Sequence, residues 1–402
     1  MLRELPPTAG LPLQWRDFLP AFDAPNFEAM LADFIGVPAV QIESSGTACL
    51  VLALESLKRL SSRRTVVIPA YTCPLVPLAI AHVGLRVRLC DTRPDRFDFD
   101  TEALAAACDS DTLCVMPTHL GGSAADLAPV LEIARGVGAY VIEDAAQSLG
   151  ATWRGRQVGT IGDIGFYSLA RGKGLTLYEG GLLVARAPEL RALLKKTSDE
   201  LISSEPIFEL LRLIQLFGYR LGYHPVGLSL SYGLPLRFWL KRGNPARAVG
   251  DEVSPVIALH RVGAWRKRIG AAALKRLAEF QMENRRRGRQ RAEECSRICG
   301  LRIMGELPES CGTWPFLMVV FDMEESCARA LSRLWRSGLG VTRLFVHPLA
   351  GYRLLKTIVP ESATPNARSL AARCLTISNS SWVSDTDFRR IRDTLAEVIR
   401  CM

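Results

Sequence analysis

The chain has 402 residues and a mass of 44.2 kDa, with 48% apolar and 23% charged residues. This balance is ordinary for a globular protein and excludes disordered, collagen-like and coiled-coil chains. Its 11 cysteines are too sparse for a disulfide-based scaffold, and none forms a CxxC pair. We therefore expect two or three domains in a reduced, cytoplasmic protein without a structural metal site.

The net charge is uneven, at −4 over residues 1–200 and +13 over residues 201–402. A basic half indicates either an anionic partner or a solvated basic face. The basic run 285–291 is interpreted as a solvated helix face, and no nucleic-acid partner is expected, because no aromatic residues interleave with its arginines. The N-terminal sequence lacks the apolar segment of a signal peptide, and no stretch of about 18 residues is apolar enough to span a membrane.

From Phe27 to about Ala185, short apolar runs alternate with helical stretches. The predicted strands are, in chain order, 39–42, 65–68, 86–90, 112–116 and 139–142. The predicted helices between them are 47–60, 75–83, 101–107 and 126–136. This alternation is typical of an α/β domain with a largely parallel sheet, in which ligands bind beyond the carboxyl ends of the strands.

Beyond about residue 189 the pattern changes. Residues 205–240 are unusually apolar, and the pattern over 255–292 predicts one long helix. Two more strands near 316–321 and 341–345, with helices at 326–336 and 385–400, predict a smaller α+β unit. We therefore predict a large α/β domain over 1–254 with an apolar insertion at about 197–250. A linking helix and a smaller C-terminal α+β domain follow over 255–402.

The first motif that suggests chemistry is Ser-Ser-Gly-Thr-Ala at residues 44–48, which follows a predicted strand and opens a predicted helix. Small residues let a ligand approach the backbone, and a helix N-terminus offers unpaired N–H groups to a phosphate. The same residues are also an ordinary helix N-cap, so both interpretations stand at this point.

The second motif is Val-Ile-Glu-Asp-Ala-Ala-Gln at residues 141–147. A carboxylate at the end of a buried strand is costly unless a cation or hydrogen bonds compensate its burial. A protonated pyridine nitrogen is one such partner for Asp144, and the cap of a following helix is the alternative role.

The third motif is a predicted strand that runs into a glycine-containing turn with one lysine, Lys173, followed by Glu-Gly-Gly at residues 179–181. A lysine near the carboxyl edge of a sheet can form a Schiff base if its pKa is depressed. The alternative is a solvated surface lysine.

In this order and spacing, the motifs resemble the DegT/DnrJ/EryC1/StrS sugar aminotransferase family of fold type I pyridoxal-phosphate enzymes. The similarity runs from about Phe27 to Val184 and more weakly from Pro255 to the end. It is carried by residues 45–48, Ile-Pro-Ala-Tyr-Thr at 68–72, Thr-His-Leu at 118–120, residues 143–147, Phe-Tyr-Ser at 166–168 with Lys173, and residues 179–181.

The resemblance implies roles for individual residues. Lys173 matches the family's Schiff-base lysine and Asp144 the carboxylate that pairs with the pyridine nitrogen, so these two are the expected catalytic residues. Gln147 matches the residue beside the phenolic oxygen of the cofactor, and His119 is expected to support the site. The expected phosphate-binding residues are Gly46, Thr47, Ala48 and Ser168.

Three positions depart from the family pattern. Cys73 stands where the family usually has an aromatic residue stacked on the pyridine ring, so stacking is lost or comes from elsewhere. Tyr178 replaces a glycine before Glu-Gly-Gly. The family's Gly-x-Asn-x-Arg segment, which reaches into the partner subunit's site, is replaced by Val-Gly-Asp-Glu-Val at residues 249–253.

The resemblance implies a cytoplasmic, homodimeric pyridoxal 5′-phosphate-dependent aminotransferase. It would move an amino group from an amino acid, such as glutamate, to a keto acceptor, such as a nucleotide sugar in polysaccharide biosynthesis. The alternatives are a different pyridoxal-phosphate reaction and a non-catalytic scaffold or regulator of the same fold, because the substrate loops have diverged.

The apolar insertion is not covered by this resemblance. Its helical part would place residues such as Ile207, Ile214 and Phe217 on one face and Glu209 and Arg212 on the other. The apolar face is expected to pack on the protein's own body or a dimer partner, to contact a membrane surface weakly, or to bind another protein. We further expect this insertion to close over the active site in place of the missing loops.

Overall fold

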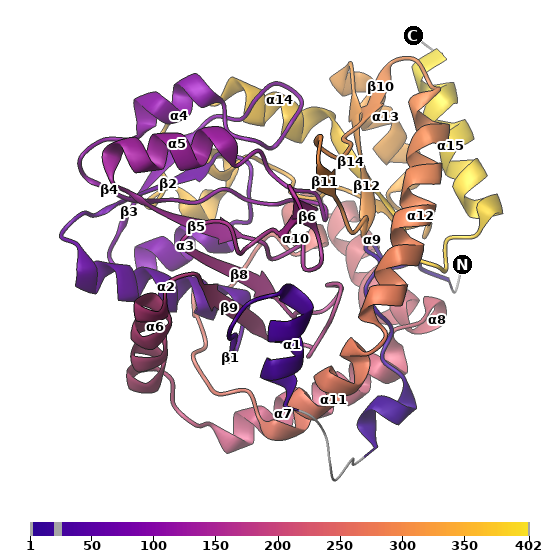
Figure 1. Ribbon diagram of the computed structural model, residues 1–402. Coiled ribbons are helices and arrows are strands. Elements are labelled where there is room, and N and C mark those ends of the chain that lie inside the picture. Colours follow the sequence, from indigo (N-terminus) through magenta and orange to yellow (C-terminus); the bar gives the residue numbers. More distant parts are fainter. Residues whose placement is uncertain (1–2, 20–25, 401–402) are drawn as a thin grey trace.

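The computed structural model describes residues 3–19 and 26–400. Its larger sheet is largely parallel, as the sequence predicts, and has seven strands. Figure 1 shows the sheet running through the centre of the larger lobe. Across the sheet the strands are β1 (Gln41–Glu43), β9 (Gly181–Ala185), β8 (Ile164–Ser168), β5 (Tyr140–Asp144), β4 (Thr112–Val115), β2 (Thr65–Pro69) and β3 (Arg86–Cys90). Strands β8, β5, β4, β2 and β3 are parallel, whereas β9 pairs antiparallel with both β1 and β8.

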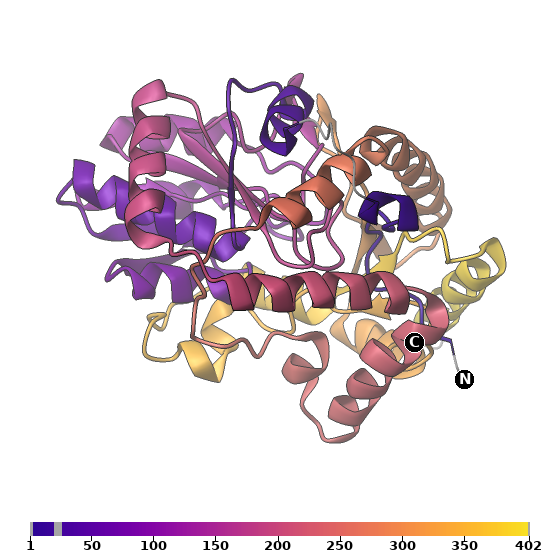
Figure 2. The same cartoon turned by 90° about the horizontal axis from the view of Figure 1, so that it is seen from below.

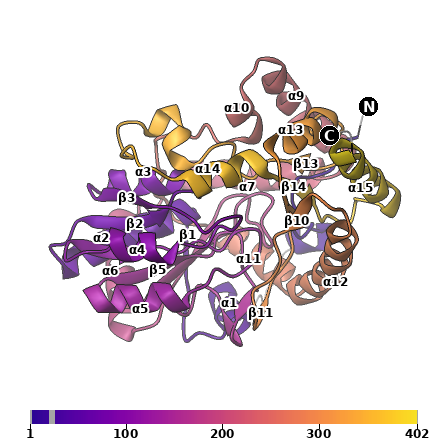
Figure 3. The same ribbon diagram turned by 90° about the horizontal axis from the view of Figure 1, so that it is seen from above.

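Helices cover both faces of this sheet because its strands are apolar on both faces (Figures 1 and 3). In β2, Val66 and Ile68 belong to a core with the helices of one face, whereas Val67 belongs to a second core with those of the other. The first group is α2 (Gly46–Leu60), α3 (Leu75–His82) and α6 (Pro188–Leu201), and the second is α4 (Thr101–Ala107) and α5 (Ala128–Val137). Helix α1 (Phe27–Ile35) packs against α11 (Ala264–Leu274).

The C-terminal part contains a second, four-stranded sheet. Its strands lie in the order β10 (Leu301–Ile303), β12 (Phe316–Phe321), β14 (Cys374–Ser378) and β13 (Val341–Thr342). The helices of this part are α12 (Leu277–Ser296), α13 (Glu324–Leu334), α14 (Pro365–Arg373) and α15 (Asp385–Arg400). A small sheet of β11 (Ser310–Cys311), β6 (Thr152–Trp153) and β7 (Arg156–Gln157) joins the two parts, because β11 pairs with β6 of the larger part. The domain boundary at residue 254 stays a prediction.

The segment expected to be an apolar insertion is helical. It consists of α7 (Pro206–Gly222), α8 (Pro225–Leu228), a π-helical turn (Ser229–Gly233), α9 (Leu234–Lys241) and α10 (Pro245–Val249). Figure 2 shows α7 lying across the face of the molecule nearest the viewer, and Figures 2 and 3 both show α9 and α10 projecting from the body.

The expectation of one helix over residues 255–292 is wrong. Residues 255–263 contain no helix, and two helices follow, α11 and α12. Helix α11 begins after Gly263, whose backbone lies against Glu209 of α7 so closely that a Cβ atom there would meet Glu209 Oε1 at 2.6 Å. The second break falls at Arg276, which donates to the Pro12 carbonyl and to Asp17 of the N-terminal segment.

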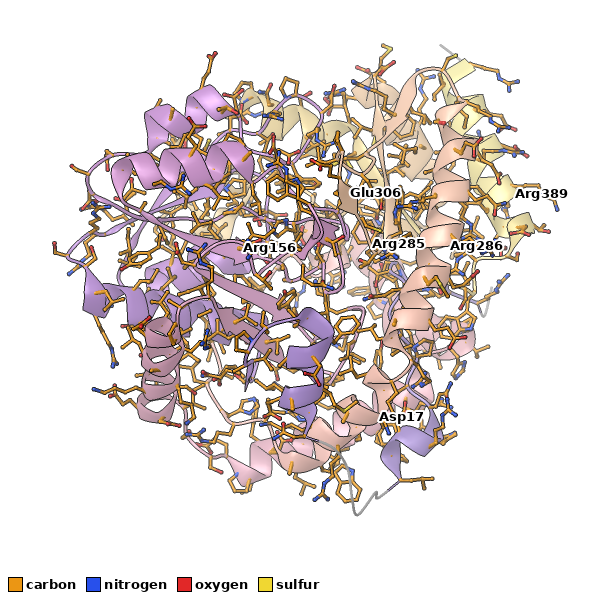
Figure 4. All side chains as sticks on the ribbon, in the orientation of Figure 1. Asp17, Arg156, Arg285, Arg286, Glu306 and Arg389 are labelled. Carbon is orange, nitrogen blue, oxygen red and sulfur yellow. The ribbon has the colours of Figure 1, made fainter. Side chains whose placement is uncertain are left out.

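The basic run on α12 is not a uniformly solvated face, which corrects a second expectation. Arg286 is exposed and pairs with Glu283, but Arg291 is buried and donates to the Val383 carbonyl. Arg285, labelled with Arg286 in Figure 4, donates to the Gly312 carbonyl. Part of the run therefore holds C-terminal loops in place.

Among the described residues, no helix is long and apolar enough to cross a membrane. The cysteines in that part of the chain carry free thiols, and Cys401 lies outside it.

Candidate active site

Lys173 lies at a cavity of about 670 Å³ between the two parts of the chain, on the turn that follows β8. A volume of this size is typical of a small-molecule site. Segments far apart in sequence line the cavity: residues 6–8, Gln147, residues 171–178, the helical segment 215–232 with residues 247–250, and residues 315–316 with Leu344. The cavity thus forms only when the whole chain has folded.

Asp144 and Cys73 are the groups that act electrostatically on Lys173. Burial lowers the pKa of the Lys173 ammonium from its ordinary value, and the nearby Asp144 carboxylate counteracts this effect. Burial raises the pKa of Cys73 to about 12, so this thiol is neutral at pH 7 and Asp144 carries the local negative charge. The structure therefore brings three of the predicted site residues together.

Asp144 ends strand β5, where the adjacent parallel strand β8 ends two residues after Phe166. Its Oδ1 accepts a hydrogen bond of 3.0 Å from the Ala146 N–H, and no donor of the described chain bonds its Oδ2. Burial raises the pKa of this carboxyl, while the Ala146 N–H and the positive charge of Lys173 lower it. A buried carboxylate with an unused oxygen is ready to accept a hydrogen bond from a ligand cation.

His119 and Glu143 form a buried pair behind Asp144. The Glu143 carboxylate accepts from the N–H groups of Gly159, Ile161 and Gly162 at 2.6–2.7 Å and from His119 Nε2 at 3.0 Å. His119 Nδ1 accepts from a backbone N–H, so the ring is the neutral tautomer with its proton on Nε2. Both ring nitrogens are thus occupied, which supports a positioning role for His119.

The N-terminus of α2 lies against the end of β8. A Cβ atom on Gly46 would meet the Cβ of Ser168 at 3.4 Å, so the two predicted phosphate-binding residues are neighbours. The N–H groups of Gly46 and Thr47 have no acceptor in the described chain, whereas the Ala48 N–H donates to Ser45 Oγ at 3.0 Å. Of the three amides predicted to bind phosphate, two are therefore free for an anion and that of Ala48 is used by the helix cap.

Gln147 lines the Lys173 cavity, as its predicted role requires. Its Oε1 accepts a hydrogen bond of 2.9 Å from the Gly121 N–H. The amide NH₂ group is therefore the part of Gln147 that is left to donate to a ligand oxygen.

Helix α7 covers the cavity with one of its faces. Gln215, Gly218, Tyr219 and Gly222 of this helix line the same cavity as Lys173, in agreement with the expectation that the insertion closes over the site. The Tyr219 ring stacks on Tyr223, with centroids 4.6 Å apart. Aromatic side chains thus line the Lys173 cavity, although Cys73 provides none.

The structure shows how the chain accommodates Tyr178, which replaces a glycine of the family pattern. Its φ is +70°, the left-handed conformation that favours glycine, so the backbone keeps the form of the family's glycine with a larger side chain. The ring lies edge-on to Tyr219 at 6.4 Å, and Arg171 lies over it at 5.0 Å. Tyr178 therefore extends the aromatic wall of the cavity.

The sequence analysis missed the contribution of the N-terminal segment. Thr8 Oγ1 donates to the Gly172 carbonyl at 2.5 Å, and a Cβ atom on Gly10 would meet the Lys173 carbonyl oxygen at 2.9 Å. Short polar and glycine residues in a coil carry no periodic signal, so only the folded chain reveals this contact.

Comparisons with known proteins place these residues in a wider context. The model of the DegT/DnrJ/EryC1/StrS aminotransferase family matches residues 22–204. Protein MosB of Rhizobium meliloti is 36% identical over 164 residues, which are 41% of this chain and 32% of MosB. GDP-perosamine synthase of Caulobacter vibrioides is 34% identical over 167 residues, which are 42% of this chain and 45% of that protein. The match thus spans less than half the length of these curated relatives.

The similarity to solved structures extends over nearly the whole chain. The aminotransferase TlmJ from Streptoalloteichus hindustanus superimposes with a TM-score of 0.71 at 25% identity, covering 93% of this chain and 90% of TlmJ. The α/β architecture with a mixed seven-stranded sheet is therefore the fold type I architecture, as predicted.

Proposed function

Because the model of the DegT/DnrJ/EryC1/StrS aminotransferase family matches residues 22–204, we propose that the protein is a pyridoxal 5′-phosphate-dependent aminotransferase of this family. It moves an amino group from an amino acid, such as glutamate, to a keto group of a sugar intermediate in polysaccharide biosynthesis. The observation that carries the proposal is Lys173 beside buried Asp144, with the free amides of α2 at the same sheet edge.

The residues present fit this cofactor. The unused Oδ2 of Asp144 suits the protonated nitrogen of a pyridine ring, and the free N–H groups of Gly46 and Thr47 suit a phosphate. Ser168 adds a hydroxyl beside Gly46, and the Gln147 amide adds a donor in the cavity. Bound pyridoxal phosphate supplies an electron-accepting ring that stabilises negative charge on the substrate Cα.

The chain's own residues hold and move protons around that ring. Asp144 keeps a proton on the ring nitrogen, and Glu143 and His119 hold the end of strand β5 from behind. Lys173, with a pKa lowered by burial, takes the proton from the substrate Cα as general base. Helix α7 shields this step from water because it covers the cavity.

The acceptor is proposed to lie between Lys173 and the tyrosines of α7. The similarity to GDP-perosamine synthase supports an amino-group acceptor of the sugar class. The cavity wall formed by Tyr178, Tyr219 and Tyr223 takes the place of the family's substrate loops and suits the apolar face of a sugar ring.

The proposal includes a homodimer located in the cytoplasm. The match to the family model supports the dimer, since the partner subunit completes the site in the family that the sequence resembles. Light scattering of the purified protein tests the dimer by its mass.

Borohydride reduction of the protein supplied with pyridoxal phosphate tests the proposal directly. We expect peptide mapping to find the reduced cofactor on Lys173, and none on the Lys173→Ala variant. An adduct on another lysine would contradict the assignment. Glutamate or glutamine alone should then convert the cofactor to its amine form, and a spectrum that both amino acids leave unchanged would indicate a non-catalytic protein.

A further inference from the structure

Helix α7 is turned with its polar side chains inward. Glu209 pairs with the buried Arg266, and Arg212 pairs with Glu179 and donates to Gln215 at 2.7 Å. The apolar face of the same helix points outward. Phe217 packs against Trp15 and Phe18, with ring centroids 5.4 and 5.8 Å apart, but most of the face stays exposed, contrary to the expectation that it packs on the protein's own body. Six large apolar side chains of α7 are 44–87% exposed: Ile207, Leu210, Leu211, Ile214, Phe217 and Leu221.

The continuous helical stretch from α8 to α9 carries a second exposed row. Its members follow one another at intervals of four residues, which places them on one side of the helical stretch. They are 47–60% exposed: Val226, Leu230, Leu234 and Phe238. Most soluble monomers do not leave so many large apolar side chains in contact with water, and such patches mark interaction sites.

The solvent-exposed charged side chains of residues 206–249 are all positive. Residues 206–249 contain six arginines and lysines and one acidic residue, Glu209, which is turned inward to Arg266. Lys241 and Arg242 are exposed at the end of α9, and Arg242 lies over the Phe238 ring at 4.3 Å. Aromatic and basic side chains side by side are typical of the interface between water and a bilayer.

The dimensions fit a helix that lies on a membrane. Helix α7 has 17 residues and is about 25 Å long at 1.5 Å per residue, so it is shorter than a membrane-spanning helix. Its inner face lines the Lys173 cavity and so cannot face lipid. Helices that lie at a membrane interface have the same arrangement: their polar face contacts the protein or water and their apolar face contacts lipid.

We propose that the outer apolar surface, formed by the ten exposed side chains of α7, α8 and α9 with Lys241 and Arg242, binds an anionic lipid bilayer. The basic residues contact lipid phosphates while the apolar rows enter the acyl region. A second copy of the chain fits less well, because a symmetric contact brings the same basic residues together. The exposed carboxylates at the edges of the surface, Glu205 and Glu252, already accept hydrogen bonds from Ser203 and Asn244.

Vesicle flotation of the full-length protein tests this surface. The probes are vesicles of phosphatidylcholine alone and of phosphatidylcholine mixed with phosphatidylglycerol, at low salt and at about 1 M salt, where the Debye length is about 3 Å. We expect the wild-type protein to float with the anionic vesicles at low salt and to be released at high salt. A protein that stays in the soluble fraction at low salt would overturn the proposal.

Two variants separate the apolar and charged contributions. The triple variant Ile207→Ser, Leu210→Ser and Ile214→Ser should bind anionic vesicles at least about tenfold more weakly, as should Lys241→Glu with Arg242→Glu. The control Met282→Ser with Met323→Ser changes exposed apolar residues outside the surface and should bind normally. If the triple variant instead splits an oligomer in light scattering and vesicle binding is absent or unchanged, the surface belongs to a second copy and the proposal fails.

Discussion

Asp144 has one oxygen bonded to the Ala146 N–H and one without a donor in the described chain. We predict that Asp144→Asn lowers turnover by at least about a hundredfold, or about 2.7 kcal/mol, because the neutral amide no longer holds a proton on the ring nitrogen. Single-turnover kinetics with saturating cofactor would measure the loss. Near-normal turnover would mean that another group pairs with the ring.

Glu143 is a buried carboxylate with four donors. Burial favours its protonated form, but His119 and the backbone N–H groups outweigh burial and hold its pKa below the ordinary 4.5. Since the folded pKa is the lower one, its contribution to stability is complete above pH 4.5 and is lost as the pH falls through the folded value.

We predict that Glu143→Gln costs about 3 kcal/mol at pH 7, because a single amide oxygen cannot satisfy four donors. Urea unfolding from pH 7 down to pH 3 measures the difference from wild type, which should shrink in acid. A difference that stays constant with pH would show that the charge of Glu143 does not contribute.

At the scale of single residues, the order of the motifs predicted the site residues that follow strands. It did not predict contacts that form only when distant segments of the chain fold together. Lys173, Asp144, Cys73 and Gln147 follow strands of one sheet, so their convergence could be expected from the α/β pattern. The contact of Gly10 with the Lys173 carbonyl joins positions 163 residues apart and depends on a coil path that no local pattern specifies.

The helices of the insertion show the same limit at the scale of elements. Periodicity correctly separated the apolar and polar faces of α7 but could not say which face turns inward. The answer depends on Arg266, a fully buried side chain on another helix that bonds Glu209 and the carbonyls of Leu177 and Glu179. A charge that must be paired inside the protein overrides the usual inward turn of an apolar face.

We predict that Arg266→Met destabilises the protein by about 3–5 kcal/mol, because it leaves Glu209 and two carbonyl groups without their donor. Arg286→Met, which breaks an exposed pair with Glu283, should cost under about 1 kcal/mol. Thermal or urea unfolding of both variants provides the measurement. An equal loss of unfolding free energy in the two variants would show that the buried pair of Arg266 does not stabilise the protein more than the exposed pair of Arg286.

At the scale of the whole molecule, the N-terminal segment ties distant parts together. Its backbone bonds Glu4 to Pro225, Leu5 to Gly338 and Leu11 to Gly174, so it touches the insertion, the C-terminal part and the Lys173 turn. Leu5 is fully buried in the core of the C-terminal part. The alternating α/β pattern predicted the larger sheet, and two strands with two helices predicted the smaller C-terminal unit, but no pattern assigned a role to these N-terminal residues. They form a coil without a partner strand, so their sequence shows no periodicity.

Leu5→Ala should therefore cost roughly 2–5 kcal/mol and lower the unfolding midpoint of the entire protein. Leu60→Ala, at an exposed position, should change stability by less than about 0.5 kcal/mol. Urea unfolding followed by tryptophan fluorescence compares the two. An unfolding midpoint of Leu5→Ala equal to that of Leu60→Ala would show that burial of Leu5 in the N-terminal segment does not contribute to stability.

The inward pairing of Arg266 also bears on how this chain could be shortened. Deleting residues 206–249 removes Glu209, the counter-ion of Arg266, and takes Leu216 out of the core that it shares with Val262 and Ile269. Arg266 then keeps only its hydrogen bonds to the Leu177 and Glu179 carbonyls, and apolar side chains that α7 covers meet water. The insertion is therefore not a detachable module: a trimmed protein needs new side chains on the apolar surface that α7 covers as well as a new partner for Arg266.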